Sequence, residues 1–155
     1  MYFCTTMKKE TKDTIILYSA DVRSILPLPY ADEGIRCGFP SPAQDYIEQS
    51  IDLNKELIGN PESTFYGRVV GESMKDANIN DGDILIIDKS KDPQDGDVVV
   101  AYLNGEFTVK TLDLSHKEEG YIQLVPANND YPAIRIDKEE DFRIWGVVTY
   151  NIKMM

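Results

Sequence analysis

The chain has 155 residues, of which 42% are apolar and 28% charged, a composition typical of one folded domain with or without an arm. Sixteen basic and 27 acidic side chains give a formal net charge of −11, and a surface of that sign repels phosphates, so we expect no direct DNA binding. No apolar run approaches the roughly 18 to 20 residues that cross a bilayer, so we expect a cytoplasmic protein with no membrane contact.

Residues 1–42 are predicted to form an extended N-terminal arm. Leu26–Pro42 contains four prolines, and proline lacks a backbone donor and restricts the residue before it. One short strand is predicted near Ile15–Tyr18. The charges of residues 1–37 sum to zero, so residues 38–155 carry the whole net charge of −11.

Residues 43–155 are predicted to form a compact, mostly β domain with one short helix. Asp52 is a favourable N-cap for a helix over Leu53–Ile58, and Asn60-Pro61 ends that helix. Beyond it, short apolar and β-branched runs alternate with Asp-Gly and Asn-Gly dipeptides, which favour tight turns. Asn104-Gly105 predicts a hairpin. The predicted strands are Phe65–Val70, Ile84–Ile87, Val98–Leu103, Phe107–Leu112, Tyr121–Val125, Ala133–Ile136 and Phe142–Ile152.

Neither a metal site nor a cofactor is expected. The two cysteines, Cys4 and Cys37, have no C-x-x-C neighbours, and the single histidine, His116, lies in a polar stretch that predicts a solvated loop. Residues 76–87 begin like a calcium-binding loop. That segment lacks the glycine at the sixth position and the glutamate at the twelfth, so it does not predict calcium binding.

Ser73 and Lys110 are candidate catalytic residues. Ser73 follows a predicted strand, where a serine can be exposed beside backbone N–H groups that form an oxyanion hole. Lys110 shares a strand face with Thr108. Burial beside the serine would disfavour the ammonium form of the lysine, and the neutral amine can then take the hydroxyl proton. The alternatives are an ordinary turn serine and a solvent-facing lysine, and a separation of 37 positions permits the pair without requiring it.

Several separated blocks of the sequence carry a family resemblance. They are Cys37–Ala43, Asp45-Tyr46, Ile51–Asn54, Gly71–Met74, Asp81–Asp83, Gly105–Lys110 and Trp145–Val148. In this order they resemble the LexA- and UmuD-like self-cleaving serine peptidases of the SOS response. The resemblance covers the chain from about residue 30 to residue 152.

The resemblance implies a LexA-like autoprotease β domain, preceded by a cleavable arm. Cys37-Gly38 matches the cleaved bond, Ser73 the nucleophile and Lys110 the general base. The backbone N–H groups of Ser73 and Met74 match the oxyanion donors. A nucleophilic role for Cys37 itself is disfavoured, because no histidine or basic cluster is placed to form a thiolate.

The resemblance also implies partners. Cleavage in the family is promoted by the RecA–single-stranded DNA filament. The product, here the 118 residues Gly38–Met155, is expected to form a homodimer and to join an UmuC-like Y-family polymerase as its accessory subunit in error-prone translesion synthesis.

Three other functions remain open on the sequence. A non-cleaving accessory module would keep the motifs without the reaction. A LexA-like transcriptional repressor is disfavoured by the short, proline-bearing, neutral arm, which does not suit a helix-turn-helix. A signal-peptidase-like enzyme also uses serine and lysine, but the internal Cys37-Gly38 site and the missing membrane anchor disfavour it.

Overall fold

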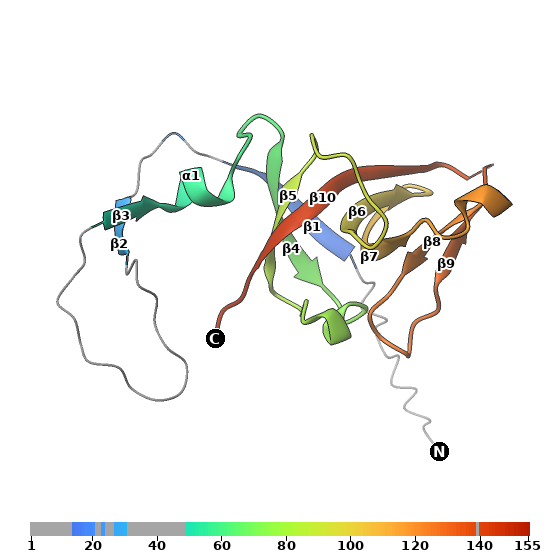
Figure 1. The fold of residues 1–155 in the computed structure, drawn as a ribbon. Coiled ribbons are helices and arrows are strands. Elements are labelled where there is room, and N and C mark those ends of the chain that lie inside the picture. The colour runs from blue at the N-terminus through green and yellow to red at the C-terminus, as the bar shows by residue number, and fades with distance from the viewer. Residues whose placement is uncertain (1–13, 21–22, 24–26, 31–48, 139) are drawn as a thin grey trace, which may run out of the picture.

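The fold is known from a computed structural model, which describes residues 14–20, 23, 27–30, 49–138 and 140–155 (Figure 1). Within this part of the chain, strands dominate and there is one short α-helix, as the sequence predicts. The elements are β1 (Thr14–Ser19), β2 (Pro27–Tyr30), β3 (Gln49–Asp52), α1 (Leu53–Leu57), β4 (Thr64–Val70), the 3₁₀ helix η1 (Lys75–Ala77), β5 (Ile84–Asp88), β6 (Val98–Leu103), β7 (Glu106–Asp113), the 3₁₀ helix η2 (Lys117–Glu119), β8 (Ile122–Val125), β9 (Ile134–Ile136) and β10 (Phe142–Ile152).

Eight of the strands form one antiparallel sheet in the order β1-β4-β5-β10-β6-β7-β8-β9. The long strand β10 crosses the body of the protein (Figure 1). Its first half pairs with β6 and its second half with β5. The register shifts between Ile144 and Gly146 and again between Val148 and Tyr150. Such bulges bend a strand and increase its twist, which lets one sheet curl around its own core.

The curled sheet encloses two apolar clusters. One contains side chains of β1, β4, β5, β6 and β7, together with Met74 and Ile79 from the loop after β4. The other contains side chains of β6 to β10. Leu85, Ile87, Val99, Val100 and Leu124 are fully buried in these clusters. Successive side chains of a strand point to opposite faces of the sheet, and both faces are buried along β6, so Val99 packs in the second cluster and Val100 in the first.

The residues of the tight turns help to fix the register between neighbouring strands. Asn104 and Gly105 form the predicted hairpin between β6 and β7, because both adopt positive φ, as the tight hairpin turn demands. The two Asp-Gly-Asp segments form equivalent turns. In each segment, the first aspartate accepts a hydrogen bond from a backbone N–H of a distant loop. The second aspartate accepts one from the backbone N–H of the residue three positions before it. These pairs are Gly71 to Asp81, Asn80 to Asp83, Leu114 to Asp95 and Gln94 to Asp97.

The strand predicted near Ile15–Tyr18 exists, and it belongs to the main sheet. It pairs antiparallel with β4 along Thr14–Ser19 and also contacts β7. Ile15 is 5% exposed and packs in the first cluster. Gly67 of β4 provides the space, since a Cβ there would lie 2.2 Å from Ile15 Cδ1. This predicted strand is therefore a paired edge strand of the main sheet, and the sequence predicted the strand without its partner.

A second, two-stranded sheet joins β2 and β3, which the sequence did not predict, and it leads into α1. The helix begins as predicted. Asp52 caps it by accepting the Asn54 N–H at 3.0 Å. The helix ends at Leu57, one residue earlier than predicted, and Ile58 is its C-cap.

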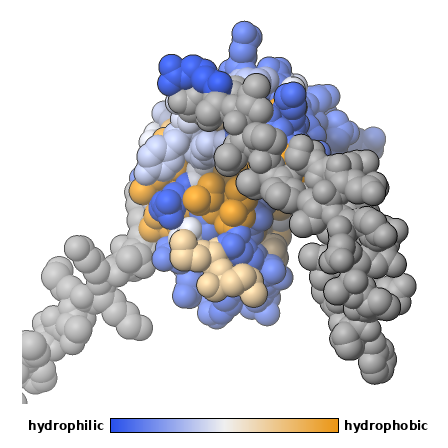
Figure 2. All heavy atoms as spheres, turned by 90° about the vertical axis from the view of Figure 1, so that its left-hand side faces the viewer, coloured by the Kyte–Doolittle hydropathy of each residue, from blue (hydrophilic) through white to orange (hydrophobic). Residues whose placement is uncertain are grey.

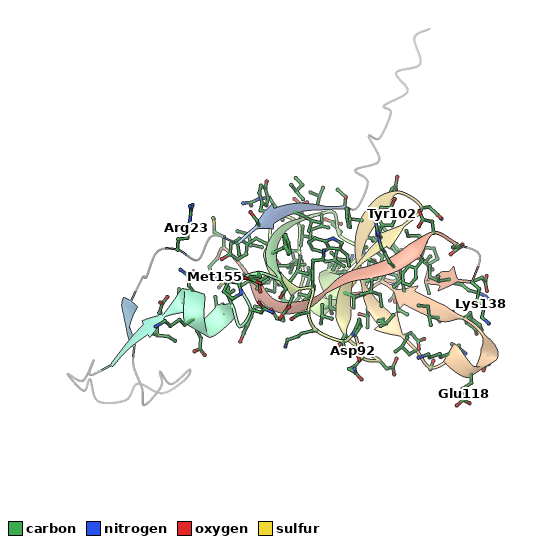
Figure 3. The ribbon with its side chains drawn as sticks, turned by 90° about the horizontal axis from the view of Figure 1, so that it is seen from above. Arg23, Asp92, Tyr102, Glu118, Lys138 and Met155 are labelled. Atoms are coloured by element: carbon green, nitrogen blue, oxygen red, sulfur yellow. The ribbon has the colours of Figure 1, made fainter. Side chains whose placement is uncertain are left out.

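The surface combines charge with exposed apolar side chains. Asp92, Glu118 and Lys138 lie at the periphery when the molecule is seen from above (Figure 3). On one side of the molecule, apolar side chains gather between hydrophilic ones (Figure 2). The exposed large apolar side chains of β1 and β10 are Ile16, Tyr18, Tyr150 and Ile152.

Candidate active site

Ser73 lies in the short loop that connects β4 to η1. The apolar strand β4 brings the chain to the edge of the first cluster, and Gly71 adopts a φ of 104°, which turns the chain away from the strand direction. Met74 is buried and fixes the loop to the core. Ser73 is only 6% exposed, so its hydroxyl lies under the surface.

Lys110 lies on β7 and meets Ser73 directly. Its Nζ is 2.9 Å from Ser73 Oγ, 2.8 Å from Thr108 Oγ1 and 3.0 Å from the Val109 carbonyl oxygen. The side chain is 4% exposed. These three neighbouring groups are neutral, and burial disfavours an ammonium ion because the ion loses its hydration. The structure thus brings together the two candidate residues that the sequence left as an optional pair.

The three contacts suit a neutral amine that acts as a base. A neutral amine has two hydrogens and one lone pair. The Val109 carbonyl can only accept, and the Thr108 hydroxyl can accept the second hydrogen. The lone pair then faces the Ser73 hydroxyl, as proton removal from serine requires.

Two backbone N–H groups beside the serine are available to a ligand. Within the described part of the chain, the amides of Ser73 and Met74 donate no hydrogen bond. The loop around them is held on both sides. Gly71 N–H donates to Asp81 Oδ1 at 2.9 Å, and the Met74 carbonyl accepts from Ala77 and Ile79. Unused donors on a fixed loop can stabilise an oxyanion without reorganisation.

A second loop, which follows β8, clamps the serine loop. The Asp76 N–H donates to the Ala127 carbonyl at 2.8 Å, and the Ala127 N–H points to Met74 Sδ at 3.3 Å. The side chain of Asn128 donates to the Glu72 carbonyl at 2.9 Å. β8 pairs with β7, so the loop that carries Asn128 starts beside the strand that carries Lys110.

A narrow pocket opens beside Ser73. Its lining includes Thr14 of β1, Val69 and Gly71, and Thr108 of β7. Because β1 pairs with β4 and contacts β7, it lies against both of the strands that position the serine and the lysine. β1 therefore narrows the approach to the two side chains.

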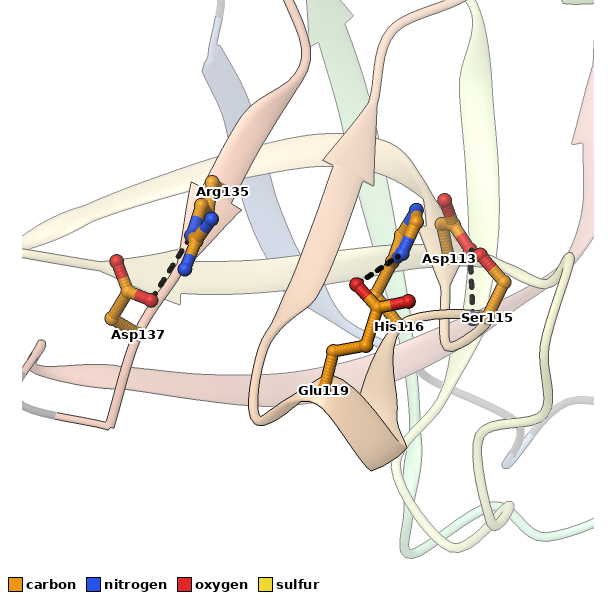
Figure 4. Close-up of polar contacts among 6 residues, drawn as sticks. All are labelled: Asp113, Ser115, His116, Glu119, Arg135 and Asp137. Carbon is orange, nitrogen blue, oxygen red and sulfur yellow. Dashed lines mark hydrogen bonds and ion pairs between the residues drawn. The ribbon is translucent and has the colours of Figure 1, made fainter.

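His116 contacts Glu119 in the loop after β7 (Figure 4), and none of its described contacts is with Ser73 or Lys110. Its described partners are Glu119, whose Oε2 lies 3.3 Å from Nδ1, and Tyr121, whose ring stacks on the imidazole at 4.7 Å. The loop residues on both sides of the histidine are exposed, and the His116 side chain itself is 35% exposed. The described residues contain no group of three or more His, Cys, Asp or Glu side chains that could hold a metal ion, and no described helix is long and apolar enough to cross a membrane.

Cys37 and Gly38, the bond matched to the family's cleavage site, lie outside the described residues. Asn128 and Thr108 complete the site, and sequence reasoning assigned a role to neither. Thr108 was recognisable only as a neighbour on the lysine's face of the strand. Asn128 gave no signal, because it lies 56 positions from the carbonyl that it contacts.

Comparisons with known proteins agree on one family. A family model described as Peptidase S24-like matches residues 29–149. Protein SamA of Salmonella typhimurium is 43% identical over 121 residues, which are 78% of this chain and 81% of that protein. Protein MucA of Escherichia coli is 39% identical over 138 residues, 88% of this chain and 92% of that protein. Protein ImpA of Shigella flexneri is 44% identical over 134 residues, 86% of this chain and 88% of that protein.

Proposed function

Because the chain belongs to the Peptidase S24-like family, we propose that it is a self-cleaving serine peptidase that cuts its own Cys37-Gly38 bond. Family membership confirms the resemblance drawn from the sequence blocks and makes the chain a member of a serine peptidase family. The assignment of the catalytic residues and of the cleaved bond is the proposal. The observation that carries it is the buried contact of 2.9 Å between Lys110 Nζ and Ser73 Oγ.

The reaction starts with Lys110 as a neutral amine. The amine takes the hydroxyl proton of Ser73, and the serine oxygen bonds to the carbonyl carbon of Cys37. The amides of Ser73 and Met74 stabilise the oxyanion that forms. When the carbon–nitrogen bond breaks, Lys110 returns its proton to the departing amine of Gly38. Water then hydrolyses the Cys37 ester and restores the serine.

Limited access to Ser73 controls the rate of self-cleavage. Ser73 is 6% exposed and Lys110 4% exposed, and Thr14 of β1 lines the pocket beside them. A substrate strand must displace part of this cover before its carbonyl reaches Ser73 Oγ. An activator that favours the open arrangement speeds cleavage, and we propose the RecA–single-stranded DNA filament as that activator.

The shortened product is proposed to act as an accessory subunit. The exposed apolar side chains Tyr150 and Ile152 on β10 support a homodimer, since exposed apolar surface favours association. The acidic charge of the product argues for a protein partner rather than DNA. We propose an UmuC-like Y-family polymerase as that partner, working in translesion synthesis during the SOS response.

Intact-mass spectrometry tests the peptidase. The purified chain is incubated at neutral and alkaline pH, with and without RecA, ATP and single-stranded DNA. We expect a product that begins at Gly38, formed faster at alkaline pH, because the neutral form of lysine then becomes more populated. S73A and K110A should abolish cleavage.

The matched controls make the same substitutions in an exposed loop. S115A and K117A should cleave at the wild-type rate, since both residues are exposed and the side chain of Ser115 contacts Asp113 rather than Ser73 or Lys110. A wild-type chain that stays whole under every condition would refute the peptidase and leave a non-cleaving accessory module as the better account.

A further inference from the structure

We infer that Asn128 is a positioning residue that aims the Ser73 N–H at the developing oxyanion. This inference rests on the proposed peptidase, in which that N–H is an oxyanion donor. It goes further by assigning a role to a side chain 55 positions from the serine in the sequence.

The argument starts from the peptide unit between Glu72 and Ser73. The Glu72 carbonyl and the Ser73 N–H belong to one planar trans unit and point in opposite directions. A group that fixes the carbonyl therefore fixes the direction of the N–H. Asn128 Nδ2 donates to this carbonyl at 2.9 Å, and the Lys75 N–H donates to it at 3.2 Å.

Asn128 is itself immobilised. It is 6% exposed, and its Oδ1 accepts the Asp130 N–H at 3.0 Å. Both ends of the amide are thus engaged, one with its own loop and one with the serine loop. The Ala127 contacts with Asp76 and Met74 hold the same loop against the other side of the nucleophile.

The contact also strengthens the donor. A hydrogen bond accepted by a carbonyl polarises the whole peptide unit, so the N–H on its other side becomes a better donor. The Ser73 N–H donates to nothing else in the described part of the chain. Asn128 and Lys75 therefore set the direction and polarity of this N–H through the Glu72 carbonyl, and its hydrogen stays unused for the substrate oxygen.

The test compares the same chemical change at two adjacent positions. N128D keeps the acceptor for Asp130 and removes the donor to Glu72, whereas N129D adds the same charge at an exposed neighbour. N128A removes the donor without adding charge. Each variant is made in the full chain and its folding is checked by urea unfolding. Self-cleavage is then followed across pH, and the labelling of Ser73 by a fluorophosphonate is timed.

We expect N128D and N128A to lower the alkaline plateau of cleavage roughly 10- to 100-fold. The whole loss of an oxyanion donor costs about 100- to 1000-fold, and here the donor stays but is aligned less well. Labelling should slow in parallel, because the reagent's phosphoryl oxygen uses the same donors. In N128A the pH at half-plateau should not move, since Lys110 keeps its contacts. N129D should behave as the wild type.

Folded N128A and N128D proteins that cleave and label within twofold of the wild type would overturn the inference. So would a shift of the pH at half-plateau with an unchanged plateau, which would place the effect on Lys110. A wild type that is labelled at Ser73 but does not cut itself would refute the self-cleavage proposal. The inference would then be decided by whether N128A and N128D are labelled more slowly than the wild type. A wild type that does neither would overturn both.

Discussion

Replacing Gly67 by alanine is expected to loosen β1 from the sheet. The new Cβ would lie 2.2 Å from Ile15 Cδ1 and 2.7 Å from Ile15 Cγ1, closer than side chains approach one another. Ile15 must then leave its position in the core, where it is 5% exposed. Overpacking of this kind costs about 1–3 kcal/mol, and the gain from replacing a strand glycine offsets about 0.5–1 kcal/mol. The net loss of unfolding free energy is about 1–2 kcal/mol.

The same substitution should have the opposite effect once Ile15 is shortened. I15A removes both of the clashing atoms, so the Cβ added by G67A fills space that the isoleucine vacated. In that background G67A should be neutral or stabilising by about 0.5 kcal/mol, because only the mobile end of Ile87 remains close. The coupling between the two positions is then about 2 kcal/mol, well above the non-additivity expected of independent sites.

Urea unfolding of the parent chain, G67A, I15A and the double variant measures this coupling. All four chains also carry S73A, so that self-cleavage does not occur during the measurement. If G67A changed the free energy of unfolding equally in the presence of Ile15 and in the I15A background, the packing argument would be refuted. The functional consequence is measured separately in chains that keep Ser73. If β1 restricts access to the serine, loosening it by about 2 kcal/mol can raise spontaneous cleavage by up to about 30-fold.

Two further predictions follow from the polar contacts. T108V removes one hydrogen-bond partner of the Lys110 amine, which lies 2.8 Å from Thr108 Oγ1. The lost hydrogen bond of about 1 kcal/mol should slow alkaline cleavage about fivefold. An unchanged rate would show that Thr108 does not orient the amine. Burial alone would raise the pKa of Asp83, but hydrogen bonds from the Asn80 amide, Lys153 and Asn151 hold that pKa below its ordinary value. The Asp83 carboxylate therefore contributes to the free energy of unfolding at pH values above its unfolded-state pKa, near about 4. That contribution is lost as the pH falls through the lower pKa of Asp83 in the folded protein. D83N should therefore be less stable at neutral pH and lose less stability on acidification to about pH 2, as urea midpoints will measure, and an acid dependence identical to that of the wild type would contradict this.

Local sequence determined most of the elements. The strand runs, the N-cap at Asp52 and the hairpin at Asn104-Gly105 follow from backbone preferences that act over a few residues, and the structure has all of them. The family blocks identified a serine and a lysine for the same reason, since each block is a short run that keeps its own signature.

Tertiary structure decided the rest, because it depends on contacts between residues far apart in the chain. Strand order brings Ser73 and Lys110 within 2.9 Å across 37 positions, and the pairing of β7 with β8 brings Asn128 behind the serine. The space that Gly67 leaves for Ile15 lets the strand predicted near Ile15–Tyr18 pair with β4 in the main sheet, a partner that the sequence alone did not predict. The backbone preferences of short segments do not specify these long-range contacts. They result from the way the bulged strand β10 curls one sheet around its core, which fixes where the ends of distant strands converge.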